Sequence, residues 1–287
     1  MAHYRENRIS RIKGALGLVL RYLSLAIGTF ISLVPLVTVL FASFKPTKEY
    51  NSTGVLQVPA NWLNFENYLT AWTKGHMGLA FTNTLLILVF TLIGAVLTGS
   101  MVAYVISRFD FRGRKLLKGA FLVANLIPGV TMQVSIYKIM TSLSLVNSIP
   151  GVVILYTGTD IISIYIFLQF FESLPKSLDE AAFLDGANYF TIFFRILFPL
   201  VKPAVVTVAI LKGVSTYKEY YIANLYLQSK TRFVTISTSL YAFTGEYGNQ
   251  YNYICAGVII TIIPILVVFL LLQKYIYNGI ASGAVKE

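Results

Sequence analysis

The stretch Phe81–Ser107, FTNTLLILVFTLIGAVLTGSMVAYVIS, contains no charged side chain. A helix rises about 1.5 Å per residue, so about 20 apolar residues cross the hydrocarbon core of a bilayer, which is roughly 30 Å thick. The stretch exceeds that length. We therefore predict that it forms a transmembrane helix.

The composition of the whole chain extends this prediction. Hydrophobic residues make up 56% of the 287 residues and charged residues 12%, whereas soluble domains carry about 25% charged residues. Five further apolar runs satisfy the same length rule: Tyr22–Ser43, Leu117–Leu143, Gly151–Phe171, Lys202–Ile222 and Ile254–Tyr277. The sequence therefore predicts an all-α membrane protein with six transmembrane helices.

The first apolar run follows a basic segment, as the apolar region of a secretory signal peptide does. The basic residues are Arg5, Arg8, Arg11 and Lys13. In a signal peptide the apolar region is about 7–15 residues long, and Tyr22–Ser43 is longer. We therefore expect this run to be an uncleaved membrane anchor.

The basic residues are unevenly divided between the loops. With six helices both termini lie on one side, and that side receives most of the 23 lysine and arginine residues. Because cytoplasmic loops carry an excess of these residues, we expect both termini and the loop Glu172–Lys202 in the cytoplasm. The expected parts are a cytoplasmic segment 1–21, a six-helix domain 22–277 with the loop 172–202, and a cytoplasmic tail 278–287. The net charge of +11 forms no single patch, so we expect no nucleic-acid partner.

The loop Glu172–Lys202 has the pattern of a folded element. Pro175 ends the preceding span, and Ser177 with Glu180 three residues later has the spacing of a capping box. Gly186 permits a sharp change of direction or a close backbone approach after this short helix. An amphipathic segment and two prolines follow: Phe190, Phe193, Ile196 and Leu197, then Pro199 and Pro203. The pattern alone also fits a helix that rests on the membrane surface.

Several residues of this loop match a known element in type and spacing. They are Glu180-Ala181-Ala182, Asp185-Gly186-Ala187, Ile196, Pro199 and Pro203. Here the chain resembles the EAA coupling loop of bacterial ABC importer permeases. The resemblance implies the type I ABC importer permease fold and a helix that docks into a cleft on a cytoplasmic ATPase subunit. The residues that it assigns to this contact are Glu180, Ala181, Ala182, Asp185, Gly186 and Ala187.

Two further segments narrow the resemblance to carbohydrate importers. Ala103–Lys115 resembles the end of the second span in carbohydrate permeases, and Gly279–Lys286 resembles the C-terminal signature of the maltose-type subunit. The chain departs from the family at Tyr217-Lys218-Glu219, where members often carry Trp-Asn before an acidic residue. It also carries Ile161 where the fourth span often has a proline. These departures put inherited substrate contacts in doubt, not the fold.

The resemblance also implies a set of partners in a bacterial cell membrane. They are a homologous second permease subunit, two cytoplasmic ATPase subunits that bind ATP and Mg²⁺, an extracellular or periplasmic solute-binding protein, and a di- or oligosaccharide. The chain has no Gly-x-x-x-x-Gly-Lys-Ser/Thr loop for ATP phosphates. We therefore expect a transport subunit with no catalytic residue, cofactor or metal of its own.

Ionisable side chains inside a bilayer cost at least about 2.5–3.5 kcal/mol each on insertion scales, so they usually face a cavity or a partner. Asp160 lies near the middle of the fourth span and Lys212 near the middle of the fifth. We expect both to face the interior, either as an ion pair or along the solute path. Tyr156, Tyr217 and Glu219 are further candidates for that path.

Two other functions stay open on the sequence alone. An ion-coupled secondary transporter half would use Asp160 and Lys212 and would need no ATPase. An ABC permease for a non-sugar solute would share the coupling loop. A membrane enzyme fits poorly, because the two histidines, His3 and His76, lie far apart and no metal or nucleophile constellation accompanies them.

Overall fold

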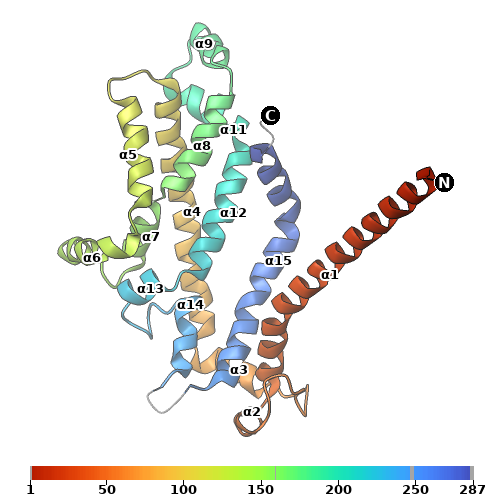
Figure 1. Ribbon diagram of the computed structural model, residues 1–287. Coiled ribbons are helices and arrows are strands. Elements are labelled where there is room, and N and C mark those ends of the chain that lie inside the picture. The colour runs from red at the N-terminus through yellow and green to blue at the C-terminus, as the bar shows by residue number, and fades with distance from the viewer. Residues whose placement is uncertain (1, 159, 246–248, 285–287) are drawn as a thin grey trace. The chain divides into compact units, whose positions relative to one another are not determined.

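The computed structural model describes residues 2–158, 160–245 and 249–284, without the side chains of residues 2–16, 272 and 274–284. Where it is described, the chain is helical and contains no β-strand. It forms two compact units, coloured along the chain in Figure 1: residues up to Ala71 with Phe243–Ile260, and Trp72–Ala242 with the residues from Thr261 on. Of the expected tail 278–287, the backbone is described to Ala284, and residues 285–287 lie outside the described part.

The helices follow one another through short loops. The first are α1 (Ala2–Phe44), α2 (Thr47–Ser52), α3 (Glu66–Lys74), α4 (Met77–Arg108), α5 (Arg114–Leu126), the 3₁₀ turn η1 (Gly129–Met132) and α6 (Gln133–Ser142). Next come α7 (Ile149–Gly158), α8 (Ile161–Ser173), α9 (Ser177–Leu184), α10 (Tyr189–Thr191), the π-helical turn η2 (Ile192–Leu197) and α11 (Phe198–Leu200). The last are α12 (Lys202–Lys218), α13 (Tyr221–Tyr226), α14 (Ile236–Ser239), η3 (Leu240–Phe243) and α15 (Tyr251–Ala284).

Among the described residues, three helices are long and apolar enough to cross a membrane: Gly17–Phe44 within α1, all of α4, and Tyr251–Leu271 within α15. α1, α4 and α15 contain the expected first, second and sixth spans. The other candidates are bent pairs: α5 with Gly129–Ser142 (92°), α7 with α8 (47°), and Tyr189–Leu200 with α12 (74°). The described part of the chain has six candidate spans only if each bent pair counts as one span. The count of six therefore stays a prediction.

The expected third span, Leu117–Leu143, is not one straight helix. Pro128 lacks a backbone N–H, and the residue before a proline avoids helical angles. Ile127 accordingly has φ −77° and ψ 121°, and α5 ends at Leu126. Hydropathy does not register this break, because the residues on both sides of it are apolar.

The expected fifth span, Lys202–Ile222, ends earlier than predicted. α12 stops at Lys218, because Glu219 takes the extended angles φ −67° and ψ 118°. The Glu219 carboxylate then accepts the N–H of Ile222 at 2.8 Å and so satisfies a free donor in the first turn of α13. The expected fourth span, Gly151–Phe171, is likewise divided between α7 and α8.

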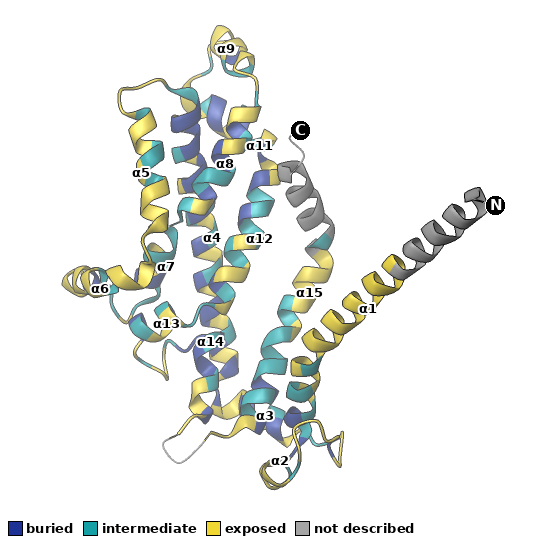
Figure 2. Cartoon of the chain, viewed as in Figure 1, coloured by how far each residue is buried: buried dark blue, intermediate teal, exposed yellow. Residues whose placement is uncertain are grey.

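In the second unit α4 lies at the centre and packs against α7, α8 and α12. Figure 2 shows the buried stripe along it. Many of its buried residues are small or polar: Ala80, Asn83, Thr84, Thr91, Ala95, Gly99, Ser100 and Ala103. Such residues let membrane helices approach closely. At Gly94 a Cβ would lie 2.7 Å from Oγ1 of Thr157 in α7, so α4 and α7 pack this closely only because residue 94 is glycine.

The first unit is held at one end by Asn67. Its side-chain amide donates to the carbonyls of Ser43 and Lys45, both at 2.8 Å. Its oxygen accepts from Nδ2 of Asn252 at 3.0 Å. The end of α1, the start of α3 and the start of α15 therefore meet there. The described part of α1 away from this end is mostly exposed, as Figure 2 shows, and most of its side chains are apolar.

Candidate functional site

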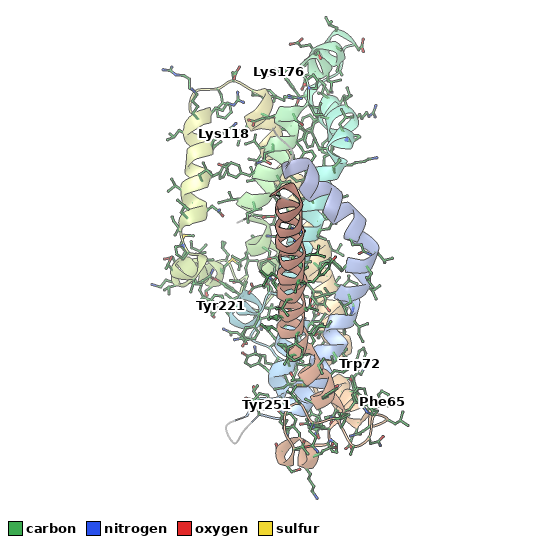
Figure 3. All side chains as sticks on the ribbon, turned by 45° about the vertical axis from the view of Figure 1, so that its right-hand side comes forward. Phe65, Trp72, Lys118, Lys176, Tyr221 and Tyr251 are labelled. Atoms are coloured by element: carbon green, nitrogen blue, oxygen red, sulfur yellow. The ribbon has the colours of Figure 1, made fainter. Side chains whose placement is uncertain are left out.

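The expected coupling segment forms α9, at one end of the second unit beyond the ends of α4 and α8 (Figure 1). Lys118 and Lys176 lie at this same end in Figure 3. α8 ends just before α9, because Leu174 precedes Pro175 and has an extended backbone, with ψ 135°. The short helix therefore begins directly after a proline-made bend.

The expected capping box at Ser177 is wrong. Lys176 stands before the first helical residue, and its φ −66° and ψ −23° are already helical, so Ser177 lies inside the first turn. No capping hydrogen bond from the Lys176 side chain satisfies this end. The N–H groups of Asp179 and Glu180 bond to the Lys176 carbonyl instead, at 3.0 and 3.2 Å. A capping serine needs an extended backbone, and the turn after Pro175 does not provide one.

Gly186 ends α9 with a left-handed turn, at φ +82°. Its N–H donates to the Phe183 carbonyl at 3.0 Å, and the N–H of Ala187 donates to the Ala182 carbonyl at 2.9 Å. These two bonds make a Schellman motif, which satisfies free carbonyls at a helix end. A Cβ at Gly186 would meet no atom within 4 Å. The backbone angle, not the space, therefore requires glycine.

The six residues assigned to an ATPase contact are not all accessible. Four are exposed: Glu180, Ala181, Asp185 and Gly186. Ala182 is buried in a cluster that includes Phe193 and Leu197 of η2, and Ala187 packs half-buried against the same cluster. The side chain of Ala182 therefore anchors α9 to this chain and leaves little of its own surface exposed, and its assignment to the ATPase contact stays a prediction.

The exposed face of α9 combines acidic and apolar groups. Beside the two carboxylates stands Leu184, which is 90% exposed, and Phe190 after the bend is 70% exposed. A cleft of about 200 Å³ lies alongside. Its lining residues are Tyr104, Arg108, Phe109, Lys176, Asp179, Glu180, Phe183 and Tyr189. An exposed apolar group next to a cleft is typical of a surface that binds another protein.

Asp160 and Lys212, the two ionisable residues expected in the interior, lie together. Nζ of Lys212 is 3.6 Å from Oδ2 of Asp160, and their side chains are 15% and 11% exposed. The ammonium also donates to the Tyr156 carbonyl at 2.5 Å, and Ser163 donates to Oδ2 of Asp160 at 2.5 Å. The Tyr156 carbonyl belongs to the last turn of α7, where carbonyls lose their helical partners. The pair therefore helps to satisfy the break between α7 and α8.

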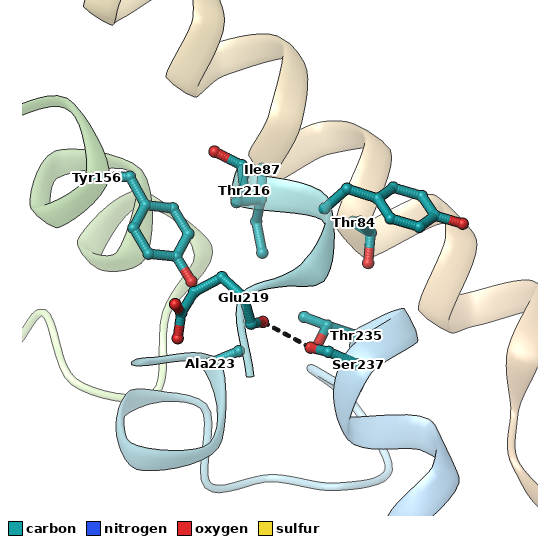
Figure 4. Close-up of a pocket in the computed structure, with 9 residues that line it drawn as sticks. Thr84, Ile87, Tyr156, Thr216, Glu219, Ala223, Thr235 and Ser237 are labelled. Carbon is teal, nitrogen blue, oxygen red and sulfur yellow. Dashed lines mark hydrogen bonds between the residues drawn. The ribbon is translucent and has the colours of Figure 1, made fainter. Parts of the chain in front are cut away.

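Tyr156, Tyr217 and Glu219, the further candidates for a solute path, line one pocket in the second unit (Figure 4). The Tyr217 hydroxyl donates to the Thr261 carbonyl at 2.8 Å, and the Ser237 hydroxyl donates to the Glu219 carbonyl at 2.6 Å. The space between the lining residues is about 10 Å³, which is room for about one water molecule. A sugar does not fit there in this conformation.

One ion pair near α9 is difficult to predict from the sequence. Arg108 at the end of α4 and Asp179 in α9 form a buried ion pair. In the sequence Arg108 is only one of several basic residues in a loop, and Asp179 stands just before the matched motif. The one available signal is that both residues flank segments that resemble the same family. Among the described residues, no group of three His, Cys, Asp or Glu side chains could hold a metal ion.

Residues 95–282 match a family model described as the binding-protein-dependent transport system inner membrane component. The diacetylchitobiose uptake system permease protein NgcG of Streptomyces coelicolor is 30% identical over 261 residues, 90% of this chain and 86% of that protein. The melibiose/raffinose/stachyose import permease protein MelC of Bacillus subtilis is 31% identical over 255 residues, 88% of this chain and 91% of that protein.

A solved structure has a similar fold. It is a chain from the crystal structure of a bacterial ABC transporter involved in the import of the acidic polysaccharide alginate. The TM-score is 0.78 at 22% sequence identity, over 92% of this chain and 96% of that chain. The two chains therefore share an overall fold.

Proposed function

This chain belongs to the family of binding-protein-dependent transport system inner membrane components, and we propose that it is one permease subunit of an ATP-driven importer of di- or oligosaccharides. The observation that carries the proposal is α9, a short helix with an exposed acidic and apolar face that ends in the left-handed turn at Gly186. The names of the two relatives, which take up diacetylchitobiose and melibiose, raffinose or stachyose, support the sugar class.

The proposed topology has six spans, made of α1, α4, α15 and the three bent pairs. The domain 22–277 holds these spans, and the segments 1–21 and 278–287 lie with α9 in the cytoplasm. The excess of basic residues on that side of the six-span arrangement supports this orientation. The exposed residues Glu180, Ala181, Asp185 and Gly186 then face the compartment that contains ATP.

The proposed mechanism is a rigid-body change, not covalent chemistry. Two ATPase subunits bind ATP and Mg²⁺ and close, and each closure displaces the coupling helix that is docked on it. A second, homologous permease moves in the same way, and the pair passes from an inward-open to an outward-open state. A solute-binding protein outside the membrane delivers the sugar. ATP binding shifts the equilibrium because it favours one of the two states.

The sugar path is proposed to lie between the two permeases. The pocket around Tyr156, Tyr217 and Glu219 has room for about one water molecule, so these residues would meet a sugar only in a conformation that opens it. Asp160 and Lys212 would line that path only if their ion pair opened as well.

The complex reconstituted in liposomes should take up raffinose or diacetylchitobiose only with ATP on the ATPase side and the solute-binding protein outside. Radiolabelled sugar inside the vesicles is the measurement. A protonophore should leave the uptake unchanged, because ATP supplies the free energy. Uptake that collapses with the protonophore and needs no ATP would favour the secondary transporter. If the solute-binding protein bound neither these sugars nor other oligosaccharides, the result would favour a non-sugar solute.

A further inference from the structure

Arg108, the last residue of α4, reaches across to α9. Its Nε lies 3.1 Å from Oδ2 of Asp179, and its Nη1 donates to the carbonyl of Leu174, just after α8, at 3.1 Å. The side chains of Arg108 and Asp179 are only 7% and 13% exposed. One guanidinium group therefore joins the ends of α4 and α8 to α9.

Stability alone does not account for this ion pair. Although Nε of Arg108 and Oδ2 of Asp179 are close, neither atom makes a hydrogen bond of good geometry within the described structure, and nor does Nη2 of Arg108. Burial raises the pKa of the Asp179 carboxyl, and the Arg108 charge opposes that rise. Taking two charges out of water is offset only when their geometry is excellent, and apolar side chains of similar size often serve a fold as well or better.

The pair sits among contacts that permit sliding. The ring of Tyr189 lies 4.9 Å from that of Phe183 in α9 and 5.0 Å from that of Phe109 after α4, measured between ring centres. Packed apolar surfaces can shift past one another in small shear motions. The ionic contact between Arg108 and Asp179 instead links one particular atom of α4 to one of α9. Separating two buried charges is costly, so the ends of α4 and α9 should move together.

α4 leads from this link to the far end of the second unit. It is one unbroken helix from Met77 to Arg108, roughly 48 Å at about 1.5 Å per residue. Near its other end Asn83 donates to the Val234 carbonyl at 2.9 Å, and Oγ1 of Thr84 accepts the N–H of Ile236 at 3.0 Å. Thr84 also lines the small pocket beside Glu219 (Figure 4). A movement of α4 along its axis would therefore reach that pocket.

We propose that the Arg108–Asp179 ion pair is the link through which α9 moves α4, and that it thereby couples ATPase closure to the pocket at the other end of α4. Both residues are positioning residues, since neither touches a nucleotide or a sugar. The inference rests on the proposed function, because it requires a partner that displaces α9. It adds a specific element, α4, and a specific contact to that function.

The test measures nucleotide affinity in the complete complex in lipid nanodiscs, with a fluorescent, non-hydrolysable ATP analogue and Mg²⁺. If ATPase closure must also move α4, the closed state is less populated and the apparent affinity is reduced by that fraction. Cutting the link should remove this restraint. We expect Asp179→Asn and the doubly neutral Arg108→Gln/Asp179→Asn to bind the analogue at least about fivefold more tightly than the unmodified complex.

Two control variants separate this role from a structural one. Asp179→Glu keeps the charge and should bind the analogue as the unmodified complex does. Asp110→Asn removes an exposed ion pair at the same end of the unit, in which Asp110 accepts from Arg114 at 2.7 Å. Exposed pairs contribute little, so this variant should not change the affinity. A structural pair would alter assembly or thermal stability and leave nucleotide affinity unchanged.

The outcomes are distinct. If Asp179→Asn fails to assemble because it leaves the Arg108 charge buried, the doubly neutral variant decides, since it carries neither charge. Equal affinity in the assembled doubly neutral variant and the unmodified complex would overturn the link. The isolated ATPase subunits are the reference for the proposed function. If they bound the ATP analogue with the same affinity as the unmodified complex, the permease would not oppose ATPase closure, and the proposed function would be contradicted.

Discussion

Lys212→Met should lower the free energy of unfolding of this chain by about 3–5 kcal/mol, the range for breaking a buried ion pair on one side. The substitution leaves the Asp160 carboxylate without the ammonium that lies 3.6 Å away. It also removes the donor to the Tyr156 carbonyl at the end of α7. Thermal unfolding and the yield of monodisperse protein in detergent would measure the loss.

Combining Asp160→Asn with Lys212→Met should recover most of that stability, because no unpaired charge is then left inside. Lys74→Met is the matched control, since Lys74 is exposed at the end of α3 and lies outside the proposed spans, and it should change stability by no more than about 0.5 kcal/mol. Sugar uptake by the double variant also separates the two readings of the pair. A structural pair predicts uptake close to normal, whereas groups on the solute path predict its loss. Single variants as stable as the unmodified chain would contradict a buried pair.

Gly186→Val should weaken the binding of the ATPase subunits about 5–150-fold and reduce sugar uptake with it. A β-branched residue at φ +82° carries backbone strain of about 1–3 kcal/mol, which corresponds to that range of affinity. The chain itself should still fold, because a Cβ there would meet no atom within 4 Å. The strain is relieved by a shift of the turn that ends α9, and this shift alters the docking surface. Titration of the reconstituted permease pair with labelled ATPase subunits measures the affinity.

Gly113→Val provides the control for backbone strain alone. Gly113 has φ +97°, also with no atom within 4 Å of a Cβ, and it precedes α5 instead of ending α9. We expect this variant to bind the ATPase subunits within about twofold of the unmodified complex, since surface changes away from a site have small effects. The coupling role of Gly186 would be untenable if both glycine variants bound the ATPase equally well.

The length of an uncharged apolar run is enough to predict the continuous helices that could cross a membrane in the described part of this chain. α1, α4 and α15 each contain a long apolar run, and lipid leaves such a run few alternatives to a helix. The bends are a different matter. Pro128 interrupts a run that is apolar on both sides, and the N–H that a proline lacks does not enter a hydropathy profile. Glu219 ends α12 because its carboxylate caps α13, a contact that depends on the three-dimensional turn.

In the candidate site, too, features set by neighbouring residues can be predicted from the sequence, whereas contacts between helices that are far apart in the sequence cannot. The turn at Gly186 depends on one residue and its neighbours, so the sequence indicates a possible change of direction there, and the structure shows that it is left-handed. The pairing of Asp160 with Lys212 joins two separate helices, so the sequence leaves an ion pair and a solute path equally open. The contact of Arg108 with Asp179 depends on the bend at Pro175, which directs α9 back over the end of α4. No local pattern contains that information.

In the proposed function α9 lies in the cytoplasm and is covered by an ATPase partner. Leu184→Cys, in a Cys255→Ser background without other cysteines, tests it directly, since Leu184 is 90% exposed and Cys255 is the only native cysteine. A membrane-impermeant maleimide should label residue 184 in inside-out vesicles and not in intact cells, and added ATPase subunits should suppress the labelling. Labelling in intact cells would place α9 outside the cytoplasm, and labelling that ATPase subunits do not change would show that they do not cover α9.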